Sequence, residues 1–265
     1  MKKRIISALV VLAIALPIVI NGGLLLDIGI ILLGLLGLKE FIDAKEGKKK
    51  LPLFIKVVSY VLLLVTLIFG LTNKEVLNLN YACLSALFMT LLIPTVLYHD
   101  RSKYSINDAF YMIGGVLFLS ISMLLLGTIR EMGLALFIYL FSITIINDTY
   151  ALITGMLIGK NKLAEDISPK KTIEGSVGGL IMGTILPVYL YVTIIDPNVS
   201  VIMISIVTIF LSILGQIGDL VFSAIKRYYN IKDFSSIMPG HGGILDRLDS
   251  IIFVMLGYML FVSLL

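Results

Sequence analysis

Nine apolar runs divide this chain of 265 residues, and they constrain its fold more than any other feature. The hydrocarbon core of a bilayer is about 30 Å thick and needs roughly 20 apolar residues per helical span. We therefore predict an all-α, polytopic integral membrane protein with about nine transmembrane helices and no soluble domain. The runs lie near residues 5–20, 24–42, 53–71, 78–98, 107–127, 132–158, 176–195, 200–225 and 247–264.

The composition excludes several other classes of protein. Hydrophobic residues make up 58% of the chain and charged residues 14%, whereas soluble domains carry about 25% charged residues. A single cysteine, Cys83, rules out a disulfide framework within one chain, and one cysteine with two histidines argues against a zinc cluster. No small-residue cleavage site follows the first run, so we expect it to be retained rather than removed as a signal peptide.

The positions of the basic residues predict how the chain is oriented. Lys and Arg concentrate in cytosolic loops, and with nine alternating helices and a cytosolic N-terminus, all of the 21 except Lys74 and Arg130 fall on the cytosolic side. The net charge of +4 is thus a matter of membrane orientation, and we expect no nucleic-acid partner. We predict a multi-pass protein of the cell (plasma) membrane with its C-terminus outside.

Polar loops separate the chain into two regions. Residues 1–100 read as about four N-terminal transmembrane helices, and residues 101–265 as a transmembrane region that carries the chemistry. The two longest polar loops, 159–175 and 226–246, both fall on the predicted cytosolic face. Any site that they form should therefore use cytosolic substrates.

Three carboxylates lie in or beside predicted spans, where an ionisable group costs about 2.5 kcal/mol or more and marks function by default. Asp108 lies at the cytosolic end of its run, and we expect it to be solvated. Asp148 lies deeper and has two interpretations, a buried hydrogen bond between helices or a group that organises a site. Asp219 follows Gly215-Gln216-Ile217-Gly218, and its glycines would let another backbone or a ligand approach closely.

Carboxylate, basic and glycine residues gather between positions 219 and 249. Carboxylates are hard oxygen ligands that suit Mg²⁺, which takes one or two of them together with substrate phosphates. Lys and Arg suit phosphate oxygens, and glycines leave backbone N–H groups free to hold an anion. The set predicts a metal-assisted phosphate site at the cytosolic membrane surface. Its members are Asp219, Ser223, Lys226, Arg227, His241, Asp246 and Asp249.

The order and spacing of these residues resemble the signature of the phosphatidate cytidylyltransferases (CDP-diacylglycerol synthases). That signature reads S-x-(apolar)-K-R, four residues, K-D, a short spacer, and P-x-H-G-G-(apolar)-x-D-R-(apolar)-D. The chain supplies Ser223, Lys226, Arg227, Lys232, Asp233, Pro239, His241, Gly242, Gly243, Asp246, Arg247 and Asp249.

A second block, which begins at Asp148-Thr149, resembles another motif of the same family. It continues through Gly159-Lys160 to Ser168-Pro169-Lys170-Lys171-Thr172 and Glu174-Gly175. Leu152 and Ile173 stand where the family often has Tyr and Trp, which puts a packing contact in doubt. The two blocks cover residues 145–250, and the first 100 residues are similar only in being hydrophobic helices.

The resemblance implies an enzyme of phospholipid biosynthesis. It would use Mg²⁺ to convert CTP and phosphatidic acid into CDP-diacylglycerol and pyrophosphate. Asp219 and Asp246 would hold the metal, with Asp249 as a further ligand, and a second cation, monovalent or divalent, is an open alternative. Ser223 and His241 would orient phosphate or metal-bound water, and Asp148 would organise the site. The predicted phosphate ligands are Ser168, Lys170, Lys171, Lys226 and Arg227.

Two other functions stay open at this point. A secondary transporter would also place charges near the membrane midplane, but here the polar residues gather on one side of the later helices and no internal repeat is evident. A related lipid nucleotidyltransferase that uses another nucleotide would have the same site. Members of the family are similar in being dimeric, so a homodimer is an expectation from the resemblance alone.

Overall fold

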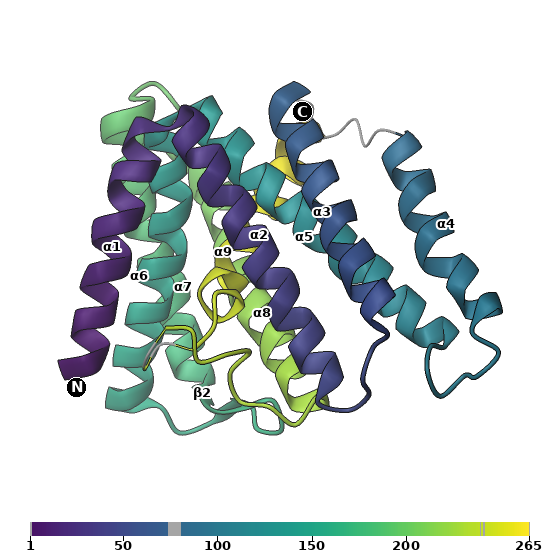
Figure 1. Cartoon of the computed structure of the whole chain (residues 1–265). Coiled ribbons are helices and arrows are strands. Elements are labelled where there is room, and N and C mark those ends of the chain that lie inside the picture. Colours follow the sequence, from purple (N-terminus) through teal and green to yellow (C-terminus); the bar gives the residue numbers. More distant parts are fainter. Residues whose placement is uncertain (1, 74–80, 239, 241, 265) are drawn as a thin grey trace. The chain divides into compact units, whose positions relative to one another are not determined.

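The computed structural model describes residues 2–73, 81–238, 240 and 242–264, with side chains from Val10 onward (Figure 1). In these residues the chain forms nine α-helices, one short π-helical turn and one two-stranded hairpin. The elements are α1 (Lys2–Asn21), α2 (Gly23–Glu46), α3 (Leu53–Asn73), α4 (Tyr81–Leu97), α5 (Ile106–Met132), α6 (Leu134–Ile158), β1 (Lys162–Ala164), β2 (Ser168–Thr172), α7 (Ile173–Leu190), η1 (Tyr191–Ile195), α8 (Val201–Tyr228) and α9 (Leu245–Ser263).

Each predicted apolar run coincides with one helix of this series, so the all-α prediction is confirmed. Five segments are long and apolar enough to cross a membrane, namely α3, α5, α6, α7 with η1, and α8. Two shorter apolar helices cover Val10–Asn21 and Tyr81–Leu97. The chain is therefore a helical membrane protein, while the count of nine spans and the division at residue 100 stay predictions.

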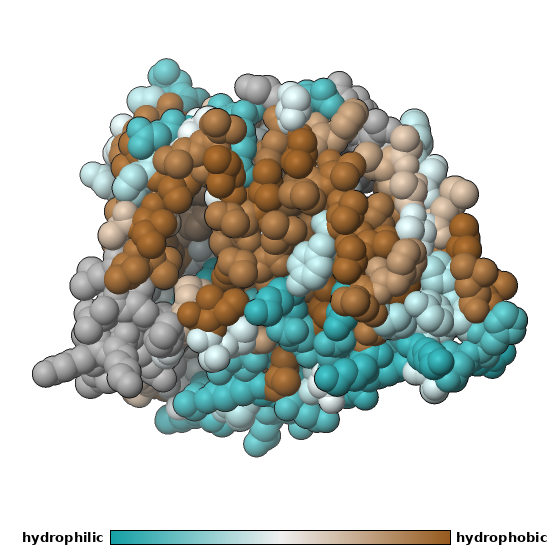
Figure 2. All heavy atoms as spheres, viewed as in Figure 1, coloured by the Kyte–Doolittle hydropathy of each residue, from teal (hydrophilic) through white to brown (hydrophobic). Residues whose placement is uncertain are grey.

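Large apolar side chains are exposed along these helices, which fits lipid as their solvent. Leu24 is 76% exposed, Phe54 53% and Val61 52%. Figure 2 shows the same pattern as a brown band over α2 and α3, with teal atoms below it. Water would make such surfaces unfavourable by about 25 cal/mol per Å², and a bilayer removes that cost.

The chain contains two compact units, unit 1 (Met1–Thr128 with Asp233–Leu245) and unit 2 (Ile129–Lys232 with Asp246–Leu265). In unit 1, α2, α3 and α5 pack together at Gly34. A Cβ atom at Gly34 would lie 2.8 Å from Leu67 Cδ1 and 3.4 Å from Met123 Cγ. A side chain larger than hydrogen at this position would therefore push the three helices apart.

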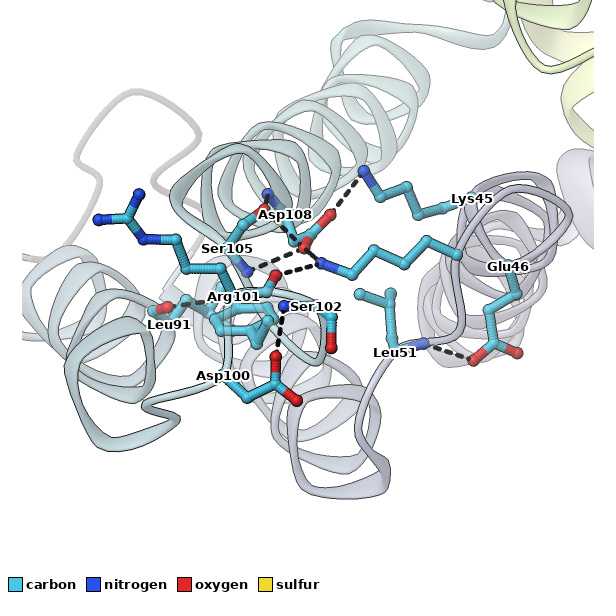
Figure 3. Close-up of polar contacts among 11 residues, drawn as sticks. Lys45, Glu46, Leu51, Leu91, Asp100, Arg101, Ser102, Ser105 and Asp108 are labelled. Atoms are coloured by element: carbon cyan, nitrogen blue, oxygen red, sulfur yellow. Dashed lines mark hydrogen bonds and ion pairs between the residues drawn. The ribbon is translucent and has the colours of Figure 1, made fainter.

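Asp108 of unit 1 is buried, which corrects the expectation that it is solvated. It is 2% exposed, and its carboxylate forms ion pairs with Lys45 at 2.7 Å and with Lys49 (Figure 3). The backbone N–H and the hydroxyl of Ser105 also donate to it, at 2.9 and 2.7 Å. Lys49 donates in addition to the carbonyl of Arg101 at 3.0 Å. The expectation was wrong because it used only the position of Asp108 at the end of its helix. That position does not reveal that two lysines, one from α2 and one from the turn after it, reach the carboxylate.

In unit 2, α6 and α7 pack in close contact. The contact depends on glycines in α7. A Cβ atom at Gly179 would lie 2.6 Å from Asn147 Oδ1, and one at Gly175 would lie 2.6 Å from the carbonyl oxygen of Ala151. The glycine spacing of α7 therefore sets how near the backbone of α6 can come.

Candidate active site

The predicted polar loop 159–175 is a folded hairpin in unit 2, which the sequence analysis did not anticipate. β1 and β2 pair antiparallel with Lys162 opposite Thr172. The Glu174 carboxylate accepts hydrogen bonds from the backbone N–H groups of Lys160, at 3.1 Å, and Asn161. The Thr172 hydroxyl caps α7 by accepting from the N–H of Gly175 at 3.1 Å. The family motif thus fixes β2 against the start of α7.

Three predicted phosphate ligands lie on β2 because of this hairpin. Ser168 begins the strand and is half-buried, Lys170 is exposed, and Lys171 is half-buried. Lys171 stands two residues before the first residue of α7, whose N-terminus carries a partial positive charge. The strand therefore presents basic side chains beside a helix end that favours anions.

The last three turns of α8 carry the next group of predicted site residues. Ser223 lies one turn after Asp219, and its hydroxyl donates to Asp219 Oδ1 at 3.3 Å. The helix then ends in a left-handed residue, Asn230, with φ 57°, and the N–H of Ile231 bonds back to the carbonyl of Lys226 at 3.0 Å. This ending stops α8 directly after its basic residues.

Two ion pairs join the predicted phosphate ligands to the predicted metal ligands. Lys171 of β2 pairs with Asp219 of α8. Lys226 of α8 pairs with Asp246 of α9 at 2.6 Å, and both residues are buried at 8% and 9% exposure. The two pairs link three separate elements of unit 2, β2 with α8 and α8 with α9, and we call these four residues with their neighbours the cluster; their roles toward metal and phosphate stay predictions.

Arg227 makes contacts that the sequence did not predict. Its Nε donates to the carbonyl of Ile167 in the hairpin turn at 3.1 Å, and its Nη1 donates to the carbonyl of Ile231 at 3.1 Å. The side chain therefore ties the β1–β2 turn to the end of α8. Its proposed contact with phosphate stays a prediction.

Asp148 and Asp249, two further predicted site residues, lie on the helices that flank α8. Asp148 lies on α6 with an exposed side chain, and Asp249 lies on α9 with 9% of its surface exposed. Asp246 and Asp249 both lie in the first turn and a half of α9.

The two glycines before Asp219 serve a close contact between helices. A Cβ atom at Gly218 would lie 2.8 Å from Phe253 Cβ and 2.9 Å from the carbonyl oxygen of Asp249. At Gly215 it would lie 3.1 Å from Val254 Cγ2. Both glycines therefore face α9, where Gly218 meets the backbone and Gly215 meets the Val254 side chain.

The donor set of the cluster suits Mg²⁺ in its chemistry. Asp219, Asp246 and Asp249 offer hard carboxylate oxygens, and Mg²⁺ is usually held by one or two of these with substrate phosphates supplying the rest. Among the residues that the structure describes, no three side chains of the metal-binding types lie close enough to hold an ion by themselves. By the chemistry of their oxygens, the three carboxylates fit a metal whose remaining ligands are phosphate oxygens.

The two remaining motif residues, Pro239 and His241, lie outside the described residues. The expected role of His241 in orienting phosphate or metal-bound water is thus a prediction.

A buried amide network beside the carboxylates was missed by the sequence analysis. Gln216 donates from Nε2 to Asn147 Oδ1 at 2.9 Å and to the carbonyl of Ser176 at 3.0 Å. The Ser176 hydroxyl donates in turn to Gln216 Oε1. One side chain from each of α6, α7 and α8 takes part, so the network fixes the helices that carry Asp148 and Asp219. The interhelical hydrogen bond considered for Asp148 is made by its neighbour Asn147.

Known proteins are similar to this chain over nearly its whole length. The chain matches the Cytidylyltransferase family over residues 2–265. It belongs to this family. The family match includes the first 100 residues, where the sequence analysis found only a general likeness.

Curated relatives from staphylococci are similar over nearly the whole chain. The phosphatidate cytidylyltransferase of Staphylococcus haemolyticus is 38% identical over 255 residues, which cover 96% of each chain. Those of Staphylococcus saprophyticus and Staphylococcus aureus are each 37% identical over 258 residues, with the same coverage. The family membership therefore rests on the entire membrane protein and on more than its two motif blocks.

Proposed function

We propose that this chain is a nucleotidyltransferase that converts CTP and phosphatidate into CDP-diacylglycerol and pyrophosphate. The observation that carries the proposal is the pair of lysine–aspartate bridges, Lys171–Asp219 and Lys226–Asp246, in a family of cytidylyltransferases. Each bridge combines a cation suited to phosphate with a carboxylate suited to a metal. The relatives named phosphatidate cytidylyltransferase supply the substrates by analogy.

The reaction joins two anions, so charge neutralisation and positioning are its main requirements. An oxygen of the phosphatidate phosphate forms a bond to the α-phosphorus of CTP, and the bond from that phosphorus to the bridging oxygen of the β-phosphate breaks. Pyrophosphate leaves with the electron pair. Phosphatidate is already ionised at neutral pH, so no residue of the chain has to remove a proton from the nucleophile.

The residues of the cluster have distinct parts in this proposal. Lys171 and Lys226 turn from their carboxylates to the substrate phosphates and reduce the repulsion between them. Asp219 and Asp246, with Asp249 as a further ligand, hold Mg²⁺. When bound, Mg²⁺ supplies positive charge to the phosphate oxygens of the transition state.

The substrates would reach the cluster from two directions. We place the motif loops and the N-terminus in the cytosol and the C-terminus outside, since nearly all Lys and Arg residues fall on one side of a nine-span arrangement. CTP then arrives from the cytosol, and phosphatidate enters sideways from the inner leaflet with its acyl chains in lipid. A homodimer stays a prediction from the resemblance.

A turnover assay tests the proposal. The detergent-purified chain is incubated with labelled CTP, phosphatidate and Mg²⁺, and label in the lipid fraction is measured. The unaltered chain should form CDP-lipid, and Asp246→Asn should lose at least about 100-fold in kcat because a charged ligand becomes neutral. The matched control is Asp196→Asn, in the turn after η1, where the carboxylate accepts a local bond from the N–H of Asn198 at 2.9 Å.

The outcomes separate the reaction from the site. Normal turnover of Asp246→Asn would keep the reaction and refute the assignment of Asp246. If CTP gives no product, the same assay with UTP, ATP and dCTP tests a related nucleotidyltransferase. No lipid product from any nucleotide would refute the proposed function and direct attention to a flux assay for a transporter.

A further inference from the structure

Glu40 is a fully buried carboxylate in unit 1 that the proposed mechanism does not use. It lies near the C-terminal end of α2 and is 0% exposed. Burying a charge is costly unless hydrogen bonds satisfy it, so its partners indicate what it does. All of the partners described come from residues 235–245, which contain the glycine-rich part of the family motif.

The carboxylate binds this motif segment at both of its ends. Glu40 Oε1 accepts from the Ser235 hydroxyl at 2.6 Å and from the N–H of Ile244 at 2.8 Å. Glu40 Oε2 accepts from the N–H of Leu245 at 2.8 Å. Leu245 is the first residue of α9, so a negative charge lies where the helix has unpaired N–H groups and a partial positive charge.

Apolar contacts beside Glu40 hold the ends of the same segment against α2. Phe234, directly before the segment, packs on Phe41, the residue after Glu40, with ring centroids 6.0 Å apart. Leu245 is fully buried, and a Cβ atom at Gly37, about one turn before Glu40, would lie 3.3 Å from its Cδ2. One turn of α2, residues 37–41, thus contacts both ends of the segment.

The glycines of the motif fit this arrangement. Gly242 has φ 87° and exchanges two backbone hydrogen bonds with Met238, at 3.0 and 3.1 Å, which closes a tight turn. Gly243 faces the carboxylate, and a Cβ atom there would lie 2.5 Å from Glu40 Oε1. Only a residue without a side chain leaves room for the Glu40 carboxylate at this position. This explains why the second position after the histidine of the H-G-G sequence is a glycine.

We propose that Glu40 is a positioning residue, which fixes the motif segment 235–245 and the first turn of α9 and so sets the place of Asp246. Asp246 follows Leu245 directly in the chain, and α9 is continuous from Leu245 onward. A shift of the Leu245 backbone is therefore passed to the proposed metal ligand through one peptide bond. The link to turnover rests on the proposed function, whereas the hold on the segment does not.

Hydrogen exchange on the full-length chain in detergent tests the hold, with Glu40→Gln as the variant. The amide retains one acceptor oxygen and replaces the other by NH₂, so one of the three donors meets another donor. An unsatisfied buried donor costs about 1–3 kcal/mol, and we expect exchange in peptides covering 235–248 to be about 10-fold faster. Exchange in peptides from α6 and α8 should be unchanged.

The matched control is Glu46→Gln, the same substitution six residues further along α2. Glu46 also accepts from a backbone N–H, that of Leu51 at 3.1 Å, and pairs with Lys56 at 2.9 Å. It should leave exchange in 235–248 and turnover unaltered. Ser235→Ala is a milder variant, which removes one donor to Glu40 and should raise exchange in 235–248 about 2–3-fold. In the double variant, Ser235→Ala with Glu40→Gln, exchange should be little faster than in Glu40→Gln alone.

Turnover of CTP into lipid is measured on the same samples, and kcat of Glu40→Gln should fall about 10-fold or more, because small misplacements of a reacting group are costly. Unchanged exchange in 235–248, or faster exchange throughout the chain, would overturn the positioning role. Faster local exchange with normal turnover would overturn the link to Asp246. An inactive unaltered chain would refute the proposed function, while the exchange result would still decide whether Glu40 holds the segment.

Discussion

Gly218 offers the most direct test of how α8 and α9 position the carboxylates, because alanine there adds one methyl group at the helix contact. The added Cβ would lie 2.8 Å from Phe253 Cβ and 2.9 Å from the carbonyl oxygen of Asp249, whereas ordinary contacts begin at 3.4 Å. The carbonyl belongs to the backbone of α9, so the helices must separate by about 0.5 Å to relieve the contact. Asp219 and Asp249 lie on the two sides of this gap.

The expected effect on stability is smaller than the effect on activity. Overpacking costs about 1–3 kcal/mol, and alanine regains about 1 kcal/mol of helix propensity over glycine. The net loss of about 1 kcal/mol should lower the Tm of Gly218→Ala by about 2–4 °C. Displaced reacting groups should lower kcat for CDP-lipid formation about 10–100-fold.

Gly114→Ala on α5 is the matched control, since a Cβ atom there meets nothing within 4 Å. Turnover of labelled CTP and loss of helical circular dichroism on heating are measured for both variants in one detergent. Gly114→Ala should keep full turnover and an equal or higher Tm. Wild-type turnover in Gly218→Ala would refute the argument that this helix contact sets the geometry of the site.

Three further predictions follow from the ion pairs and the proposed metal. Lys226→Met leaves the buried Asp246 carboxylate without this partner and should cost about 3 kcal/mol of stability in thermal unfolding, whereas Lys226→Met with Asp246→Asn should recover stability and stay inactive. Asp108→Asn weakens the bridges from Lys45 and Lys49, so we expect the free energy of unfolding to fall by about 2 kcal/mol and the KM for CTP to stay the same. A changed KM with unaltered stability would contradict this. Chelation of divalent ions should abolish turnover without loss of helical dichroism, and added Mg²⁺ should restore it; turnover that persists in chelator would argue against a metal.

Glu40 shows that the sequence can mark a buried charged residue as unusual but does not identify its partners. It lies inside the predicted run 24–42, so the rule that directed attention to Asp148 and Asp219 applied to it as well. Its neighbours in the sequence give no further indication, because its partners Ile244 and Leu245 lie 204 and 205 positions later in the chain. A single sequence does not reveal such a pairing, since no local period or spacing links the two segments.

Arg227 and Asn147 show the same limit at shorter range. Spacing put Arg227 among the phosphate ligands, but the fold of the hairpin places a backbone carbonyl within reach of its guanidinium. Asp148 was considered for a hydrogen bond between helices, and the residue before it makes that bond. Which of two adjacent side chains on a helix faces a neighbour depends on the rotation of the helix, and an almost uniformly apolar sequence does not specify that rotation.

Sequence alone is enough to establish the membrane environment and the helices, and it predicts the residues of the candidate site. Lipid demands apolar runs of a certain length and full internal hydrogen bonding of the backbone, so length and hydropathy suffice to locate helices. The tertiary structure alone decided that Lys171 meets Asp219, that Lys226 meets Asp246, and that Glu40 holds the motif segment. These contacts depend on how glycine-lined helices approach each other, and that distance is a property of packed pairs of elements that no single segment contains.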